Sequence, residues 1–299
     1  DAEVGDSILF FGTKTSNHDD KVLSYYKVEN VFPSFKIIKQ FHSNQKVLLA
    51  ENDGRFFPSG FKIRIETEPL NSICDVFNGL NPGNVRHILL SKERENDMYK
   101  KLILGKDIKK YNLNWSGTWV NYDPSLKSKL KPSDTKSKSG MTAQSKVDFA
   151  LRDESIFLGE KLIVRKTADH IIAAYDQNEF YYDSLSYGIK LRENPNVSIL
   201  FILGLLNSKL LNFIHEGLSD NKEKVFAKVL AINLSLLPVP KITMSKKGFK
   251  EKHDEIVNLV STLLQLNEEI RETKLDVTRQ QIQIKTVYCE NKIDQIVFQ

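Results

Sequence analysis

The 299-residue sequence has only two cysteines, Cys74 and Cys289, and no long hydrophobic run. Two distant cysteines argue against a disulfide framework and a zinc finger, and they are typical of a reducing, cytoplasmic setting. The longest apolar stretch, residues 198–206, is too short to span a membrane. The first residues, DAEVGDSILFFGTK, lack the basic start of a secretory signal. We therefore expect a cytoplasmic protein without a membrane segment.

The positive charge is concentrated in one segment of the chain. Residues 100–146 hold eleven Lys, no Arg and three Asp, a net of +8, whereas the whole chain carries +5. A lysine block is more often a solvated surface than a ligand site. It is also the electrostatic pattern of a protein that binds a polyanion.

Hydrophobic patterning predicts an α+β fold in three regions. Residues 1–75 are β-rich, residues 76–247 mix strands and helices, and residues 248–299 are helical. Alternating β-branched and aromatic residues predict strands at 6–14, 21–31, 35–41, 45–51, 60–67, 118–123, 161–167 and 170–176. Apolar spacing predicts helices at 96–104 and 197–216, and the polar tract 127–140 is predicted to be an exposed, mobile loop.

The third region carries a seven-residue repeat. Apolar residues recur at Ile256, Leu263, Ile270, Val277 and Ile284. Leu259 and Leu266 supply companion positions, which Thr273 and Gln280 then weaken. This spacing predicts a long, coiled-coil-like helix that packs on its own domain or docks another helix.

The motifs of methyl transfer are missing. An adenine methyltransferase needs a glycine-rich turn after its first strand and an Asn/Asp-Pro-Pro-aromatic loop to hold a flipped base. FFGTK has one glycine, and NPGN at residues 81–84 lacks both the second proline and the aromatic. Phosphate-binding loops and serine nucleophile elbows are also absent. We therefore expect no catalytic residue in this chain.

Carboxylates and histidines give weak signals for a metal site. A magnesium-dependent nuclease needs two or three carboxylates and a lysine. Asp153, Glu154, Glu160 and Lys161 could supply them, as could the sequence DIK at residues 107–109, but such fragments arise by chance in a chain with 27% charged residues. The six histidines are scattered, so we expect no bound metal.

Three basic clusters in the mixed region suit a nucleic acid. Lys106, Lys109 and Lys110 lie beside Tyr111 and Trp115, a combination that fits phosphates and sugars. The other two clusters are Arg165 with Lys166, at the end of a predicted strand, and Lys222, Lys224 and Lys228, after the leucine-rich helix.

Four segments, in order, resemble the TaqI-like C-terminal specificity domain, the target recognition domain of type IIG restriction–modification enzymes and DNA adenine methyltransferases. They are LILGKDIKKYNLNWSGTWVNYDP (102–124), GEKLIVRKTADHIIAAYDQNEFYYDSL (159–185), LFILGLLNSKLLNFIHEG (200–217) and VFAKVLAINLSLLPVPKI (225–242). They span nearly half of the chain.

The resemblance implies sequence-specific recognition of double-stranded DNA by a mixed β-sheet target recognition domain at residues 76–247. The leucine-rich helix would be scaffold, the charged loop after it would face DNA, and residues 248–299 would form a spacer or dimerisation helix. Residues 77–93 resemble a DNA-proximal segment only loosely. The expected DNA-binding residues are Asn81, Asn84, Arg86, Lys106, Lys109, Lys110, Arg165, Lys166, Lys222, Lys224 and Lys228.

The resemblance also implies partners. Residues 1–75 resemble the tail of a methyltransferase domain, so we expect a methyltransferase domain or subunit as partner. S-adenosylmethionine is expected for that catalytic half, and no cofactor for this chain. Self-association through the helical region is a further expectation.

Three alternatives stay open. The chain could be a stand-alone specificity subunit that assembles with separate methyltransferase chains. It could be a magnesium-dependent nuclease, or a general polyanion binder without sequence preference.

Overall fold

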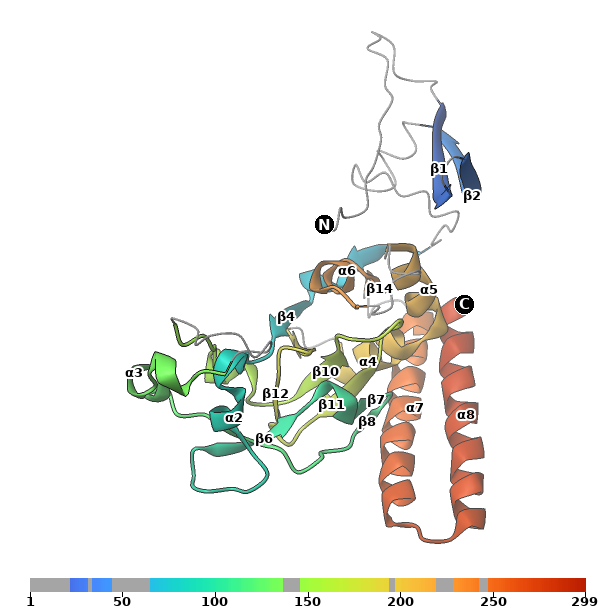
Figure 1. Cartoon of the computed structure of the whole chain (residues 1–299). Helices are drawn as coiled ribbons and strands as arrows, with labels where there is room; N and C mark the ends of the chain where they lie inside the picture. Colours follow the sequence, from blue (N-terminus) through green and yellow to red (C-terminus); the bar gives the residue numbers. More distant parts are fainter. Residues whose placement is uncertain are drawn as a thin grey trace. The chain divides into compact units, whose positions relative to one another are not determined.

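The structure is a computed structural model that describes residues 22–31, 34–44, 65–136, 146–193, 197–218, 228–241 and 247–299. The chain divides into two compact units, Asp1–Lys62 and Ile63–Gln299 (Figure 1). Residues 65–75, which the sequence grouped with the first region, therefore belong to the second unit.

The described part of the first unit is a β-hairpin. Strands β1 (Val22–Val31) and β2 (Ser34–Asn44) pair antiparallel, and their register shifts between Lys27 and Val28. The strands predicted at 21–31 and 35–41 are confirmed. Those predicted at 6–14 and 45–51 lie outside the described residues, as does most of the one at 60–67.

The second unit combines short strands with helices, which confirms the α+β prediction. Its strands are β3 (Thr67–Pro69), β4 (Cys74–Asn78), β5 (Leu90–Ser91), β6 (Tyr99–Ile103), β7 (Ile108–Lys109), β8 (Asn112–Leu113), β9 (Trp119–Asn121), β10 (Lys161–Arg165), β11 (Ala173–Asp176), β12 (Tyr181–Tyr182), β13 (Ser186–Leu191) and β14 (Pro238–Pro240). Its helices are α2 (Arg86–Leu89), α3 (Leu126–Lys129), α4 (Ile199–Asn207), α5 (Lys209–Leu218), α6 (Ala231–Ser235), α7 (Lys247–Glu272) and α8 (Asp276–Phe298). Single 3-10 turns are η1 (Leu70–Ser72), η2 (Gly83–Val85), η3 (Gly105–Asp107), η4 (Pro132–Asp134) and η5 (Glu154–Ile156).

A four-stranded antiparallel sheet, in the order β11-β10-β13-β4, forms the centre of this unit. Side chains alternate between the two faces of a strand. On β10, Leu162 and Val164 enter one core cluster, whereas Ile163 enters a second cluster on the opposite face. Both faces are therefore buried, which explains why the sequence of this strand is apolar without alternation.

A second sheet, in the order β12-β6-β9-β5, carries the other side of the second cluster. Strand β6 overturns one prediction, because residues 96–104 were expected to form a helix. The segment pairs instead with β9, and Leu102 and Ile103 are fully buried. Cross-strand packing here outweighs a local helical pattern, as is common for short apolar runs.

The tract 127–140 is more ordered than predicted in its described part. It holds the last residues of α3 and all of η4, and Lys136 N–H donates to the Asn84 carbonyl at 2.9 Å. Leu126 anchors the tract in a small third cluster with Val85, Leu89 and Phe149. Residues 137–140 lie outside the described residues.

The segment Pro238–Val239–Pro240 closes the unit by pairing with its first strand. Strand β14 runs antiparallel to β3, with Val239 opposite Glu68. Val239 is fully buried and the flanking prolines are half-buried. Proline lacks an N–H group, so it suits a two-stranded edge where few ladder hydrogen bonds are needed. The Pro-x-Pro motif therefore pairs residues 238–240 with residues 67–69, near the start of the second unit.

The leucine-rich helix is two helices, not the single helix predicted at 197–216. Helix α4 ends at Asn207 and α5 begins at Lys209, with a bend of 62° between them. The Ser208 hydroxyl donates to the Leu205 carbonyl at 2.6 Å and accepts the Leu211 N–H at 3.2 Å. Side-chain bonds of this type end one helix and start the next.

The Asn207 side chain fastens this bend to the central sheet. Its amide nitrogen donates to the Ala173 carbonyl at 2.9 Å, and its amide oxygen accepts the Ala173 N–H at 3.0 Å. Asn212, one turn into α5, accepts the Ile171 N–H at 2.6 Å. The two asparagines therefore satisfy the backbone beside β11, which would otherwise be buried without partners.

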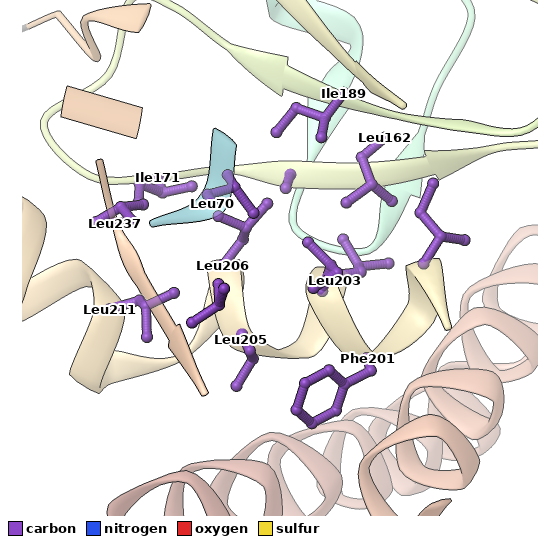
Figure 2. Packing of buried hydrophobic residues seen from close by; sticks show 14 of the residues in the cluster. Leu70, Leu162, Ile171, Ile189, Phe201, Leu203, Leu205, Leu206, Leu211 and Leu237 are labelled. Carbon is purple, nitrogen blue, oxygen red and sulfur yellow. The ribbon is translucent and has the colours of Figure 1, made fainter. Parts of the chain in front are cut away.

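Helix α4 lies between the sheet and the C-terminal helices. Figure 2 shows Leu162 and Ile189 pointing from the sheet toward α4, and Phe201 pointing away from the sheet toward the C-terminal helices. Phe201 packs there against Phe249 and His253 of α7, with ring centroids 6.2 and 4.8 Å away. No single helix among the described residues is long and apolar enough to cross a membrane, although α4 and α5 meet the length and composition criteria if counted as one bent pair.

The C-terminal region is an antiparallel helical hairpin and not one long helix. Helices α7 and α8 run side by side (Figure 1), and residues 273–275 form the turn between them. Ile256 and Leu263 are buried against the core as the repeat predicts. Val277 and Ile284, which continue the repeat past the turn, are 68% and 70% exposed. The turn rotates α8 so that Ile282, Cys289, Ile293 and Ile296 become its buried residues.

We predict that Gly204→Ala destabilises the unit although alanine is the better helix former. A Cβ at residue 204 would lie 2.6 Å from Cγ2 of Ile256 and 3.2 Å from Cγ2 of Val260, because α4 and α7 meet closely there. We expect a loss of about 1–3 kcal/mol in the free energy of unfolding from overpacking, against a propensity gain of about 1 kcal/mol. Urea denaturation measures the net effect.

Two further variants separate the steric effect from other causes. Gly204→Ala combined with Ile256→Ala should lose less stability than the sum of the two single variants. Gly248→Ala, in the first turn of α7 with nothing within 4 Å of the added methyl group, should cause no loss. Additive single effects would show that the α4–α7 contact is not the constraint we describe.

Candidate nucleic-acid interface

The turn at residues 183–186, which joins β12 to β13, brings several predicted residues together. Leu185 N–H donates to the Asp183 carboxylate at 3.1 Å and Ser186 N–H to the Asp183 carbonyl at 2.9 Å, which defines the turn. The Leu185 carbonyl accepts the Lys166 N–H at 2.9 Å. A Cβ on Gly105 would lie 3.6 Å from Leu185, so Lys106 follows directly beside this turn.

Two more basic residues reach the same turn. The Lys166 carbonyl accepts the Val229 N–H at 2.8 Å, so the exposed Lys228 lies next to Lys166. Arg86, at the start of α2, places Nη1 3.7 Å from Oδ2 of Asp183. We call Arg86, Lys106, Lys166 and Lys228 the basic turn cluster.

The members of the cluster differ in how they are held. The Lys166 ammonium lies 5.1 Å from the centroid of the Tyr187 ring, within the range of a cation–π contact. Lys106 is exposed in η3, whose Asp107 carboxylate accepts the Leu104 N–H at 2.9 Å and fixes the turn. Arg86 is held by an ion pair, and its side chain is 48% exposed.

Asp183 is an unusual residue in this setting. Its side chain is 1% exposed, and Oδ2 has no hydrogen-bond partner among the described residues. Burial raises the pKa of this carboxyl, while the Leu185 N–H and the Arg86 guanidinium act to lower it. The sequence YYDSLSYG indicates a turn at this point, but nothing in it shows that the aspartate is buried or that Arg86, 97 residues away, reaches it.

Asn81 and Asn84 have backbone partners. The Asn84 amide donates to the Lys146 carbonyl at 2.9 Å and accepts the Asp148 N–H at 3.0 Å, and Asn81 accepts the Gly83 N–H at 3.2 Å. Gly83 has φ +49°, and a Cβ there would lie 1.7 Å from the Asp148 carbonyl oxygen. The NPGN segment thus staples residues 81–84 to residues 146–150, and a role for its asparagines in reading bases stays a prediction.

Lys109 and Lys110 lie on the side of the C-terminal hairpin. The Lys110 ammonium is 3.6 Å from the Glu290 carboxylate of α8 and 5.6 Å from the Tyr111 ring centroid. Lys109 is exposed on β7. Tyr111 itself is buried, and burial raises the pKa of its hydroxyl, so its ring is part of the core and not a surface platform.

The aromatic surface suggested near Tyr111 is formed instead by tryptophans. Trp115 and Trp119 pack edge to face with ring centroids 5.2 Å apart, and the Lys101 ammonium lies 5.1 Å from the Trp115 ring. Sequence reasoning named Trp115 but missed Lys101 and Trp119. Their pairing depends on the β6–β9 register, in which Lys101 stands opposite Trp119.

The remaining predicted residues are placed as follows. Arg165 ends β10 opposite Ser186, so it too lies at the 183–186 turn, and it is half-buried. Lys222 and Lys224 lie outside the described residues.

The structure gives the four proposed nuclease residues other contacts. Lys161 is fully buried and lies 2.6 Å from the carboxylate of Asp176, which is also fully buried. Burial lowers the pKa of Lys161 and raises that of Asp176, and their mutual attraction opposes both shifts. The Asp176 carboxylate also accepts the N–H groups of Asn178 and Phe180 at 2.9 Å. The pair therefore fixes the loop after β11.

The three carboxylates of that set point to separate partners. Asp153 accepts the Ser155 N–H at 2.9 Å, Glu154 accepts the Tyr181 hydroxyl at 2.5 Å, and Glu160 accepts the Tyr175 hydroxyl at 2.8 Å. Within the described residues, no group of three or more His, Cys, Asp and Glu side chains could hold a metal ion. The nuclease alternative is not supported.

A known protein family matches the part of the chain that holds most of the basic turn cluster. Residues 100–239 match the family model of the TaqI-like C-terminal specificity domain, which confirms the resemblance found in the sequence and includes every member of the cluster except Arg86. A relative from Methanocaldococcus jannaschii, described as a type II restriction enzyme and methyltransferase, is 23% identical over 303 residues. That match covers 99% of this chain and 23% of the relative, so the chain spans about a quarter of the relative's length.

Solved structures give similar, more distant matches. The type IIL restriction–modification enzyme MmeI in complex with DNA has 12% identity and a TM-score of 0.48, over 79% of this chain and 34% of that one. The HsdS subunit from Thermoanaerobacter tengcongensis has 13% identity and a TM-score of 0.37, over 83% of this chain and 49% of that one.

We predict that Lys161→Met destabilises the chain strongly, because it leaves the Asp176 carboxylate buried without its counter-charge. The expected loss is about 3–5 kcal/mol in the free energy of unfolding. Adding Asp176→Leu to Lys161→Met should recover much of that loss, because an apolar pair needs no counter-charge. Urea denaturation at neutral pH measures both. A double variant no more stable than Lys161→Met would show that the hydrogen bonds of Asp176 to the loop, and not the ion pair, hold this region.

Proposed function

We propose that this chain recognises a specific sequence in double-stranded DNA, as the specificity part of a restriction–modification adenine methyltransferase. The observation that carries the proposal is the match of residues 100–239 to a specificity domain. The gathering of basic side chains from four separate segments at the 183–186 turn supports it.

The interface would work through two kinds of contact. Lysines of the basic turn cluster would neutralise phosphates and fix the register of the protein on the duplex, a role that carries no sequence information by itself. Side chains that reach base edges in the major groove would supply the discrimination. Neither contact requires catalysis by this chain.

We further propose that methyl transfer, with S-adenosylmethionine as donor, belongs to a methyltransferase part outside these 299 residues. The relative with both activities in its description is about four times longer than the region it shares with this chain. The sequence NPGN, the nearest approach to a base-holding loop, serves here as a staple between residues 81–84 and 146–150.

The C-terminal hairpin supports a second proposal, that α8 is an assembly surface for a methyltransferase chain or a second copy of this chain. Five large apolar side chains of α8 are exposed and lie away from its buried apolar residues. They are Val277 (68%), Ile284 (70%), Val287 (56%), Tyr288 (66%) and Phe298 (58%). An exposed apolar stripe on a helix usually marks an interaction site.

We predict that the chain selects duplexes with a shared consensus of several base pairs from a random pool at about 150 mM salt, where nonspecific contacts are weak. Lys106→Ala and Lys166→Ala should weaken binding to all selected duplexes alike. Each should also reduce the magnitude of the log–log salt slope by about 0.9, because one phosphate contact is lost. If the selected duplexes share no consensus, sequence-specific recognition is contradicted and the alternative of a general polyanion binder remains.

We predict that Val277→Glu with Ile284→Glu abolishes helix-mediated assembly without loss of stability, because both side chains are exposed. Sedimentation velocity of the wild type over a range of concentrations should show a dimer that the double variant lacks. Gln283→Glu, exposed on the same helix but off the stripe, is the matched control. A monomer at every concentration would exclude self-association and leave the methyltransferase chain as the partner to test.

A further inference from the structure

The carboxylate of Asp183 is buried at a cost that the turn alone does not explain. A turn of this kind needs one acceptor oxygen, and Oδ1 fills that role by accepting the Leu185 N–H. Oδ2 is buried without a hydrogen bond among the described residues, and an unpaired buried carboxylate is strongly unfavourable. Within the described residues, the cation that forms an ion pair with this carboxylate is Arg86, whose Nη1 lies 3.7 Å from Oδ2. Unsatisfied buried groups of this kind often have a functional cause.

The contact leaves most of the Arg86 guanidinium available. Arginine has five N–H donors, and the approach to Asp183 at 3.7 Å is made by Nη1. Nε and Nη2 donate no hydrogen bond within the described residues, and the side chain is 48% exposed. The Nε–Nη2 edge is a planar pair of donors, which matches the O6 and N7 acceptors of guanine.

The other candidate base readers are held differently. Both functional groups of the Asn84 amide bond to the backbone of residues 146–148. Arg165 is half-buried at the end of β10, and no ion pair fixes its guanidinium within the described residues. A side chain that must discriminate bases has to be positioned within a fraction of an ångström by its neighbours. Of these three candidates, Arg86 is the one whose charged group an ion pair orients.

We propose that Arg86 reads a guanine in the recognised DNA sequence through its Nε–Nη2 edge, and that Asp183 is the positioning residue that holds it for this task. The assignment rests on the proposed function. It separates Arg86 from the lysines of the basic turn cluster, which contact phosphates.

The test compares the base preferences of three variants with those of the wild type. Duplexes selected from a random pool define the wild-type consensus, and the affinities for all four bases at each consensus position are then measured at fixed salt. Arg86→Ala should lose about 5- to 150-fold of the preference for guanine at one position and leave the other positions unchanged. Arg86→Lys keeps the charge but not the planar pair of donors, so it should restore less than half of the lost preference on a logarithmic scale.

Asp183→Asn tests the positioning role. The asparagine oxygen can still accept the Leu185 N–H, while the charge that attracts Arg86 is gone. We expect a thermal midpoint no lower than that of the wild type, since a desolvated carboxylate is removed, together with a weaker guanine preference at the position that Arg86→Ala affects. A purely structural role for Asp183 would lower the midpoint and leave the preferences intact.

Each remaining outcome also decides the question. A uniform loss of affinity in Arg86→Ala, with a smaller salt slope and unchanged preferences, would make Arg86 a phosphate contact and overturn the proposal while the proposed function stands. A wild-type consensus without guanine would overturn it as well. If the wild type selects no consensus, the proposed function fails and this assignment fails with it. Arg192→Ala is the matched control, because Arg192 is also ion-paired with an aspartate, Asp75, and is 49% exposed. It should leave the preference at the Arg86-dependent position unchanged.

Discussion

Strand β10 is buried on both faces, and the arrangement of the second unit follows from that burial. Leu162 and Val164 pack toward α4, and Ile163 packs toward the second sheet. Each such side chain contributes about 1.5–3 kcal/mol when it is fully removed from water. Because neither face of β10 reaches solvent, polar side chains of this strand can reach solvent only near its ends. Arg165 and Lys166 at the end of β10, and the turn before β13, are such places, and the basic residues of the interface are found there.

Two buried carboxylates of this unit illustrate the difference between a structural and a poised ion pair. Asp176 is 2.6 Å from Lys161, accepts two backbone N–H groups, and is closed off from solvent together with its partner. Asp183 is 3.7 Å from Arg86, accepts one backbone N–H, and its partner remains half exposed. In the first pair, the charged groups bond to each other and to the backbone, so neither can contact a ligand. The second leaves donors of the arginine unused, which is the state expected of a group that awaits a ligand.

The sequence predicts the strands of this fold better than it predicts where the helices break and how they pack. The strands at β1, β2, β9, β10 and β11 follow from β-branched and aromatic patterns, and the α+β class follows with them. The break at Ser208 was missed because the apolar spacing continues across it, and only the hydrogen bonds of Ser208 reveal the bend. The seven-residue repeat wrongly predicts that Val277 is buried, for a related reason. The three-residue turn rotates the next helix, yet the apolar spacing in the sequence continues unchanged across it.

The candidate site was predictable in part, because charge can be counted along a sequence while ion pairs between distant segments cannot. The lysine-rich segment indicated a polyanion partner, yet it did not show that Lys110 faces Glu290 while Lys106 lies at the 183–186 turn. Tyr111 looked like a surface aromatic and proved to be core, since its environment is set by the C-terminal helices and not by its neighbours in sequence. Nothing in the sequence distinguishes Asp183, because a lone aspartate in a turn is ordinary.

Affinity and discrimination make different demands on a side chain, and the proposed interface would meet them with different residues. A lysine on a flexible stem can neutralise a phosphate from many directions, so it needs no buried support. An arginine that distinguishes guanine must adopt one orientation, and fixing a long side chain costs about 1.5–2 kcal/mol of conformational entropy if it is done on binding. If Asp183 positions Arg86 as we propose, the side chain is oriented when the protein folds, and this entropy cost falls on folding and not on DNA binding. On this proposal, the desolvation of one carboxylate would be offset by a sharper choice between bases, which would account for a buried carboxylate beside the basic turn cluster.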